Sequence, residues 1–99
     1  MALAVKKVYS NSALRDLAQQ FEILADPTRL IVLGLLAKNE LNISAIAEAT
    51  GMTHGAVSHH LLRFYLSKFV EKKRDGSFVI YSLTDLGRAF VTSAERLLK

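Results

Sequence analysis

Two helix signals lie only a few residues apart in the middle of the chain, and their spacing constrains the fold most. Asn42 or Ser44 can cap a short helix, and Gly51 can end it because glycine adopts left-handed backbone angles at little cost. Thr53 can then cap a second helix only two residues later. A short helix, a glycine turn and a capped helix are typical of a helix-turn-helix motif, which we predict over about residues 44–67.

The second helix of this motif divides into a core side and an outward side. Val57, His60, Leu61 and Phe64 recur at helical spacing and predict the buried side, with His60 as a structural histidine. The residues on the opposite side or its flanks are mostly small, polar or basic: Gly55, Ser58, His59, Leu62 and Arg63. We therefore expect this helix to present a largely polar surface to a partner.

After this helix the sequence changes to a pattern of two short strands. The segment of about residues 69–83 is rich in β-branched, aromatic and basic residues, and Asp75-Gly76 favours a two-residue hairpin turn. That turn would place Arg74 opposite Ser77. We predict a hairpin with an apolar base and a basic tip.

Further helices are predicted on both sides of this unit. A first helix runs from Asn11 or Ser12 to Leu24, since its apolar residues are spaced three and four apart. Asp26-Pro27 provides a cap and a first helical position for a second helix. Its apolar residues predict that it is the buried centre, and they are Leu30, Ile31, Leu33, Leu35 and Leu36. Thr84 can cap the last helix.

The expected fold class is mainly α with a two-stranded β-wing, a winged helix-turn-helix that dimerises through its first and last helices. No repeat, low-complexity tract or linker interrupts residues 1–99, so we expect a single domain. Its dimerisation helices would span about 12–24 and 84–98.

Several classes of protein are excluded by what the sequence lacks. It has no cysteine, no apolar run that could span a bilayer and no secretion signal, so we expect a cytoplasmic protein without a membrane partner. It also has no glycine-rich phosphate loop, nucleophile elbow or HExxH motif. We therefore expect neither an enzyme nor a bound cofactor.

The excess positive charge is concentrated in one segment. The net charge of the chain is +4, and residues 52–81 hold five basic side chains against two acidic ones. A surface that binds a polyanion needs such a local excess. A solvated basic face would have the same balance, so charge alone does not decide between the two.

The helix-turn-helix and the basic hairpin together indicate double-stranded DNA as the partner. The major groove admits one α-helix, and the N-terminal turns of the motif's second helix reach the base edges. The candidate base contacts are Thr53, His54, Gly55, Ser58 and His59. The candidate phosphate contacts, which give affinity without sequence information, are Arg63, Lys73, Arg74 and Ser77.

Four ordered segments resemble the ArsR/SmtB family of transcriptional repressors. They are Leu24–Leu30 (LADPTRL), Ile46–Gly51 (IAEATG), Ala56–Leu61 (AVSHHL) and Gly76–Leu83 (GSFVIYSL). The resemblance implies a homodimeric winged-helix repressor that binds operator DNA and releases it when an inducer, often a metal ion, binds. By position, it assigns the same residues of the second helix and the hairpin to base and backbone contacts.

Three residues depart from the pattern of that family. Leu62 stands where the family more often has a basic residue, and Leu66 lies one turn beyond it. Three roles are open for these leucines: packing against the hairpin, packing against a partner chain, or contact of Leu62 with a thymine methyl group. Lys68 replaces the usual glycine at the helix end, which costs left-handed strain if that geometry is kept.

The metal sites that the resemblance implies are absent or degenerate in this sequence. Without cysteine there is no thiolate site. Asp85 matches the first carboxylate of a second kind of site, but Gly87 and Leu98 stand where its next ligands would be, and Glu95 has no evident imidazole partner. The inducer therefore stays unknown.

The terminal helices predict a homodimer, because each has an apolar stripe that a 99-residue core cannot easily cover. The expected interface residues are Leu14, Leu17, Phe21, Leu86, Phe90 and Leu97. A two-fold dimer presents two recognition helices to successive major grooves, so the operator should be pseudo-palindromic.

The sequence thus predicts a sequence-specific DNA-binding repressor. Two alternatives are a regulator that responds to a non-metal ligand, and a winged-helix protein-interaction module without DNA binding. The exposed leucines favour the second alternative, and the basic hairpin tip opposes it.

Overall fold

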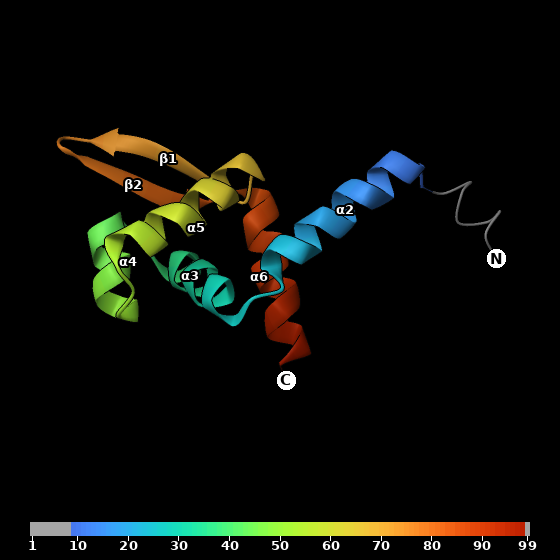
Figure 1. The fold of residues 1–99 in the computed structure, drawn as a ribbon, viewed down its shortest axis with the longest axis horizontal. Helices are drawn as coiled ribbons and strands as arrows, with labels where there is room; N and C mark the ends of the chain where they lie inside the picture. Colours follow the sequence, from blue (N-terminus) through green and yellow to red (C-terminus); the bar gives the residue numbers. More distant parts are fainter. Residues whose placement is uncertain (1–8, 99) are drawn as a thin grey trace.

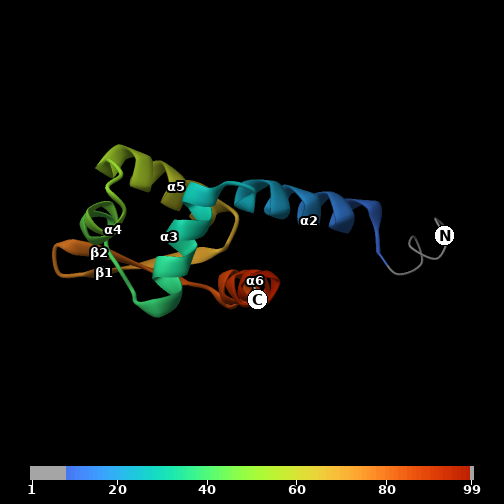
Figure 2. The ribbon, with the colours of Figure 1, turned by 90° about the horizontal axis from the view of Figure 1, so that it is seen from below.

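The computed structural model describes residues 9–98, which form five helices and one β-hairpin (Figures 1 and 2). The elements in chain order are α2 (Asn11–Leu24), α3 (Pro27–Lys38), α4 (Ile43–Thr50), α5 (His54–Leu66), β1 (Val70–Asp75), β2 (Phe78–Leu83) and α6 (Asp85–Leu97). The predicted class, mainly helical with a two-stranded wing, is confirmed. In this part of the chain no helix has the length and apolar character needed to cross a membrane.

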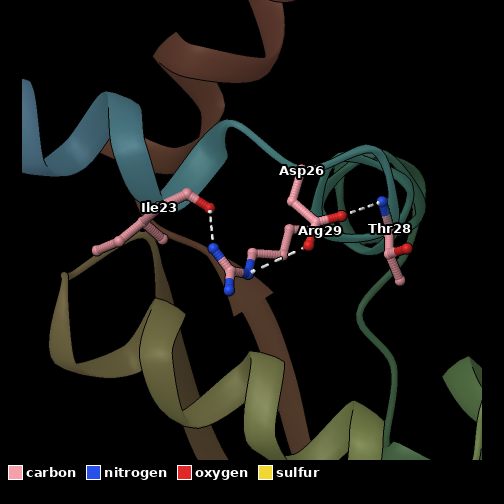
Figure 3. A network of polar contacts seen from close by, with 4 residues as sticks. All are labelled: Ile23, Asp26, Thr28 and Arg29. Atoms are coloured by element: carbon pink, nitrogen blue, oxygen red, sulfur yellow. Dashed lines mark hydrogen bonds and ion pairs between the residues drawn. The ribbon is translucent and has the colours of Figure 1, made fainter.

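Side-chain caps determine where most of these helices begin. Asp26 accepts a hydrogen bond from the backbone N–H of Thr28 at 2.8 Å, as predicted (Figure 3). Pro27 occupies the first turn of the helix, also as predicted. Thr53 and Thr84 cap α5 and α6 in the same way. Each such cap contributes about 1 kcal/mol, so these polar residues stabilise the starts of α3, α5 and α6.

The starts of α2 and α4 were less well defined by the sequence. Asn42 rather than Ser44 caps α4, since its side chain accepts a hydrogen bond from the N–H of Ala45 at 2.8 Å. Ser10 caps α2, so this helix begins at Asn11 and not one residue later.

The core lies between α3, α4, α5 and the base of the hairpin. Its twelve buried members are Leu24, Val32, Leu33, Leu36, Ile46, Ala47, Val57, Leu61, Phe64, Phe69, Val70 and Leu83. Burying a large apolar side chain stabilises the fold by about 1.5–3 kcal/mol. This cluster therefore holds α5 against α3 and α4 and joins the hairpin base to them.

α3 is only in part the buried centre that its sequence predicts. Leu33 and Leu36 are buried and Leu35 is partly covered, but Leu30 and Ile31 are exposed. The elements that pack on α3 within one chain cover a single side of it. A helix that is apolar all round predicts burial, but the pattern does not reveal whether the chain itself or a second molecule covers the remaining side.

The register of the hairpin differs from the predicted one. Arg74 pairs with Val79 rather than with Ser77, so the central turn residues are Gly76 and Ser77 instead of Asp75 and Gly76. Gly76 has a φ of 64°, and it is the first central residue, where a type II′ turn requires glycine. A type I′ turn with Asp75 and Gly76 at its centre would instead need a positive φ at both of these residues. Asp75 does not have a positive φ.

α2 projects away from the rest of the molecule, opposite to the hairpin tip (Figures 1 and 2). The radius of gyration is 15.4 Å, larger than the roughly 13 Å of a compact chain of this length. Within one chain α2 packs mainly on the start of α3 and, through the edge-on contact of Phe21 with Phe90, on α6. Much of its apolar stripe therefore stays uncovered.

Candidate nucleic-acid interface

The turn between α4 and α5 sets the direction in which α5 runs. Gly51 has a φ of 75°, the left-handed conformation that was predicted for it. The Thr50 hydroxyl donates to the carbonyl of Ile46 at 2.8 Å and accepts from the N–H of Met52 at 3.2 Å. Met52 is also packed partly against the core. Hydrogen bonds and packing together give α5 a defined orientation on the core.

The first turns of α5 present small and polar side chains to solvent. Val57, Leu61 and Phe64 have no exposed surface, so the chain itself covers the inner face of the helix completely. The residues predicted to face bases are all exposed: Thr53, His54, Gly55, Ser58 and His59. Arg63, predicted to meet phosphate, is exposed as well. α5 therefore offers a convex polar ridge.

Gly55 leaves the backbone of this ridge open to close approach. A Cβ atom added there would meet no heavy atom within 4 Å, so the packing of the chain itself does not require glycine. Glycine in a helix costs roughly 0.5–1 kcal/mol relative to alanine. Its use on the exposed face is consistent with a partner that approaches the backbone at this point.

His60 lies on the inner flank of α5 and is half-buried. Its Nδ1 atom is buried and has no hydrogen-bond partner in the described part of the chain. Burial lowers the pKa of His60, and the nearby guanidinium of Arg29 lowers it further. His60 therefore faces inward as expected, but within residues 9–98 its buried Nδ1 lacks the hydrogen bond that a satisfied structural histidine would have.

Arg29 is held at the junction of α2 and α3 (Figure 3). Its Nη1 donates to the carbonyl of Ile23 at 3.0 Å, and its Nε lies 3.9 Å from Oδ2 of Asp26. The guanidinium of Arg29 is therefore held by a backbone carbonyl of α2 and by Asp26, the N-cap residue of α3.

α5 ends in a Schellman motif built without glycine. The N–H of Phe69 donates to the carbonyl of Phe64 at 2.9 Å, and that of Lys68 donates to Tyr65 at 3.1 Å. Lys68 has a φ of 66°, so the left-handed geometry expected at this helix end is present in a residue for which it is strained. The motif turns the chain directly from α5 into β1.

The basic residues of the hairpin divide between its two faces, because neighbouring side chains of a strand point to opposite sides. Lys72 lies over the ring of Tyr65 in α5, with its Nζ 4.5 Å from the ring centre, so Lys72 and Arg74 share the face toward α5. Lys73 points to the other face, where its Nζ is 3.3 Å from a carboxylate oxygen of Glu40. The structure therefore separates Lys73 from Arg74.

The tip of the hairpin and the N-terminal end of α5 extend toward the same end of the molecule (Figures 1 and 2). Arg74 and the turn residue Ser77 are exposed there. Phe78 beside the turn is exposed too, which the sequence analysis did not anticipate. The strand pattern alone could not show it, since the predicted register was wrong.

The apolar residues predicted to form a dimer interface differ in exposure. Leu17, Phe21 and Leu97 are exposed, and Leu97 keeps 85% of its accessible surface. Leu14 is partly covered, and Leu86 and Phe90 pack partly against the core. The ring of Phe90 lies edge-on to Phe69 with 5.1 Å between centroids. One part of the apolar stripe of α6 therefore packs on the core of its own chain, and the C-terminal end of this stripe stays exposed.

Gly87 of α6, which stands where the family resemblance implies a metal ligand, has no room for a side chain. A Cβ atom at Gly87 would overlap the carbonyl oxygen of Phe69, whose backbone closely approaches α6, and would lie 3.2 Å from Leu83. No histidine side chain can be built at this position without moving the hairpin base. Over residues 9–98 no group of three or more His, Cys, Asp or Glu side chains could hold a metal ion.

The chain is similar to known transcriptional regulators. The sequence model of the family "Bacterial regulatory protein, arsR family" matches residues 26–72. The HTH-type transcriptional regulator KmtR of Mycobacterium tuberculosis is 38% identical over 63 residues, which are 64% of this chain and 48% of KmtR. The transcriptional repressor SmtB homologue of Synechocystis is 37% identical over 79 residues, 80% of this chain and 60% of that protein. The chain thus spans about half the length of these curated relatives.

A solved structure has the same architecture. The homodimeric winged helix-turn-helix DNA-binding domain of a possible ArsR-family transcriptional regulator from Mycobacterium bovis superposes with a TM-score of 0.76 at 29% identity. The match covers 91% of this chain and 85% of that domain. The helix-turn-helix, the hairpin and both flanking helices lie within the shared fold.

Proposed function

Because the chain belongs to the ArsR family of bacterial transcriptional regulators, we propose that it is a repressor that binds a pseudo-palindromic operator as a homodimer. The observation that carries this proposal is the convex polar ridge at the start of α5. Its inner face is completely covered by the core, while every predicted base-facing residue is exposed. The major groove of B-DNA is wide enough for one such helix.

The residues of the ridge would divide between two kinds of contact. Ser58 and His59 can donate and accept hydrogen bonds at base edges, and Gly55 allows the backbone to come close. Arg63 and Arg74 would meet phosphates on either side of the groove, which supplies affinity for any sequence. Thr53, His54 and Ser77 complete the proposed contact set at the two ends of this surface.

Lys73 would also contact phosphate, after exchange of its ion pair. Its partner Glu40 is a carboxylate on an exposed loop, and both side chains are more than half exposed. Such surface pairs contribute only about 0–1 kcal/mol. A DNA phosphate could therefore replace Glu40 at small cost.

The proposed dimer would use the uncovered apolar surfaces of α2 and α6. Leu17 and Phe21 on α2 and Leu97 on α6 are exposed in one chain. To reach successive major grooves, the dimer formed by covering these residues must hold its two α5 helices about one helical turn of DNA apart, roughly 34–36 Å. An operator with two related half-sites would follow from the two-fold symmetry.

We further propose that this regulator lacks the metal sites usual in its family. The close approach of Phe69 to Gly87 opposes a histidine ligand on α6. A non-metal ligand is then the alternative inducer.

Selection of bound duplexes from a random-sequence pool tests the proposal, with parallel arms containing divalent metals or a chelator. The expected product is a two-fold symmetric consensus whose binding is the same in both arms. Recovery of sequences without symmetry or preference would contradict operator binding, and release by metal would contradict the proposed absence of metal sites.

A protein-interaction module without DNA binding is the second candidate, and the exposure of Leu62 and Leu66 on α5 favours it. The two candidates differ in salt dependence. Binding to DNA weakens steeply with salt, because each neutralised phosphate releases counterions, whereas an apolar protein contact does not.

A further inference from the structure

Leu62 and Leu66 are two large apolar residues on the outward side of α5, and more than half of each stays exposed in one chain. Leu62 keeps 53% of its accessible surface and Leu66 keeps 71%. The hairpin contacts α5 through Lys72 and Tyr65. More than half of each leucine thus stays exposed in one chain, so contact with DNA or with a partner chain remains open for this surface.

The helical positions put Leu62 inside the polar ridge. With about 100° between successive residues, Leu62 lies about 40° around the helix from Ser58 and about 60° from His59 on the other side. Opposite to it are Val57 and Phe64, which are fully buried. A surface that contacts both Ser58 and His59 and extends one further turn along α5 would therefore also cover Leu62.

We propose that Leu62 determines operator sequence by contacting the C5-methyl group of a thymine in the major groove. This inference rests on the proposed function, since it requires that Ser58 and His59 face base edges. The thymine methyl is the one apolar group that base pairs present in this groove.

Leu66 is excluded from this role by its distance along α5. It lies about 6 Å beyond Leu62 and about 12 Å beyond Ser58, at 1.5 Å of rise per residue. Only the first turns of a recognition helix reach base edges. Leu66 is therefore a matched control, with the same side chain on the same face of the same helix.

Replacement of single thymines by deoxyuridine in the selected duplex tests the proposal, because it removes only the methyl group. For the unaltered chain, one position in each half-site should lose affinity about fourfold, which corresponds to the roughly 0.8 kcal/mol of one buried methyl group. Leu62→Ala should bind the thymine and deoxyuridine duplexes equally. Leu66→Ala should retain the fourfold difference. Both side chains are exposed, so neither substitution should unfold the chain.

The outcomes distinguish this inference from the function on which it rests. If a selected duplex binds but no deoxyuridine position weakens it, or if Leu62→Ala keeps the difference, Leu62 does not contact thymine and repression through DNA stands. The same conclusion follows if Leu66→Ala alone abolishes the difference. If no duplex is preferred over others, both the proposed function and this inference are wrong.

Discussion

α5 and α6 are helices of the same length in one small molecule, yet the chain covers their apolar residues differently. α5 buries Val57, Leu61 and Phe64 completely in its own core and exposes small and polar side chains over its first turns, while Leu62 and Leu66 stay exposed farther along the helix. α6 packs only part of its stripe on the core and leaves Leu97 exposed. A polar convex face suits a polyanion in a groove, whereas an apolar face suits another apolar surface. This difference supports the proposal that the start of α5 contacts DNA and that the exposed end of α6 contacts a second copy.

The largest effect is expected where α5 meets the core. Phe64→Ala should lower the free energy of unfolding by about 3–5 kcal/mol, because it removes a fully buried ring and leaves a cavity. Chemical denaturation measures this loss. Because Phe64 packs within one chain, this loss of unfolding free energy should be the same at low and at high protein concentration.

A charge on the exposed end of α6 should weaken the association of two chains rather than the folding of one chain. Leu97→Glu should weaken self-association at least tenfold, since an unpaired carboxylate would enter an apolar contact in each protomer. Sedimentation over a range of concentrations measures the shift from dimer to monomer. If the variant self-associates as the original chain does, this end of α6 is not in the interface.

Substitutions on the DNA surface should separate specificity from affinity. His59→Ala should cost about 1–3 kcal/mol for the selected duplex but little for unrelated DNA. Arg74→Ala should weaken binding to all sequences alike and reduce the salt dependence by about one phosphate per chain. Titrations of both variants at several salt concentrations give the two quantities. Equal effects of the two substitutions on specificity would contradict the assigned roles.

A smaller effect is expected at the end of α5. Lys68→Gly should raise the free energy of unfolding by about 0.5–1 kcal/mol, because glycine removes the left-handed strain at a cost in backbone entropy. Lys68→Ala, which keeps the strain and removes the charge, is the control. A gain in the alanine variant would show that the charge and not the geometry is responsible.

The smallest effect is expected from titration of His60. Its pKa in the folded chain is lowered by burial and then by Arg29, while Asp26 opposes the shift. The unfolded chain therefore binds the proton more readily. His60 contributes stability that is complete above its ordinary pKa of about 6.5 and is lost as pH falls through its lower folded-state pKa. Denaturation of the His60→Gln variant should show a weaker fall in stability over this acidic range.

Local signals in the sequence were sufficient to predict the order and type of the elements. Capping by Asp26, Thr53 and Thr84 and the left-handed Gly51 depend on neighbouring residues only, so they could be identified from the sequence. The left-handed Lys68 was anticipated only by comparison with a family that has glycine there.

Features that depend on distant residues could not be predicted. The hairpin register was ambiguous, because Asp75-Gly76 and Gly76-Ser77 are both good turn dipeptides. The ion pair of Lys73 with Glu40 joins residues that are far apart in the sequence. The exposure of Leu30 and Ile31 depends on which side of α3 the chain covers.

Methylation protection of guanine N7 on the selected duplex tests most directly whether α5 lies in the major groove. The account predicts two protected tracts about one helical turn, or 10 base pairs, apart, and loss of both when Ser58 and His59 are replaced by alanine. Binding that leaves the major-groove N7 atoms reactive, or that protects a single tract only, would contradict it.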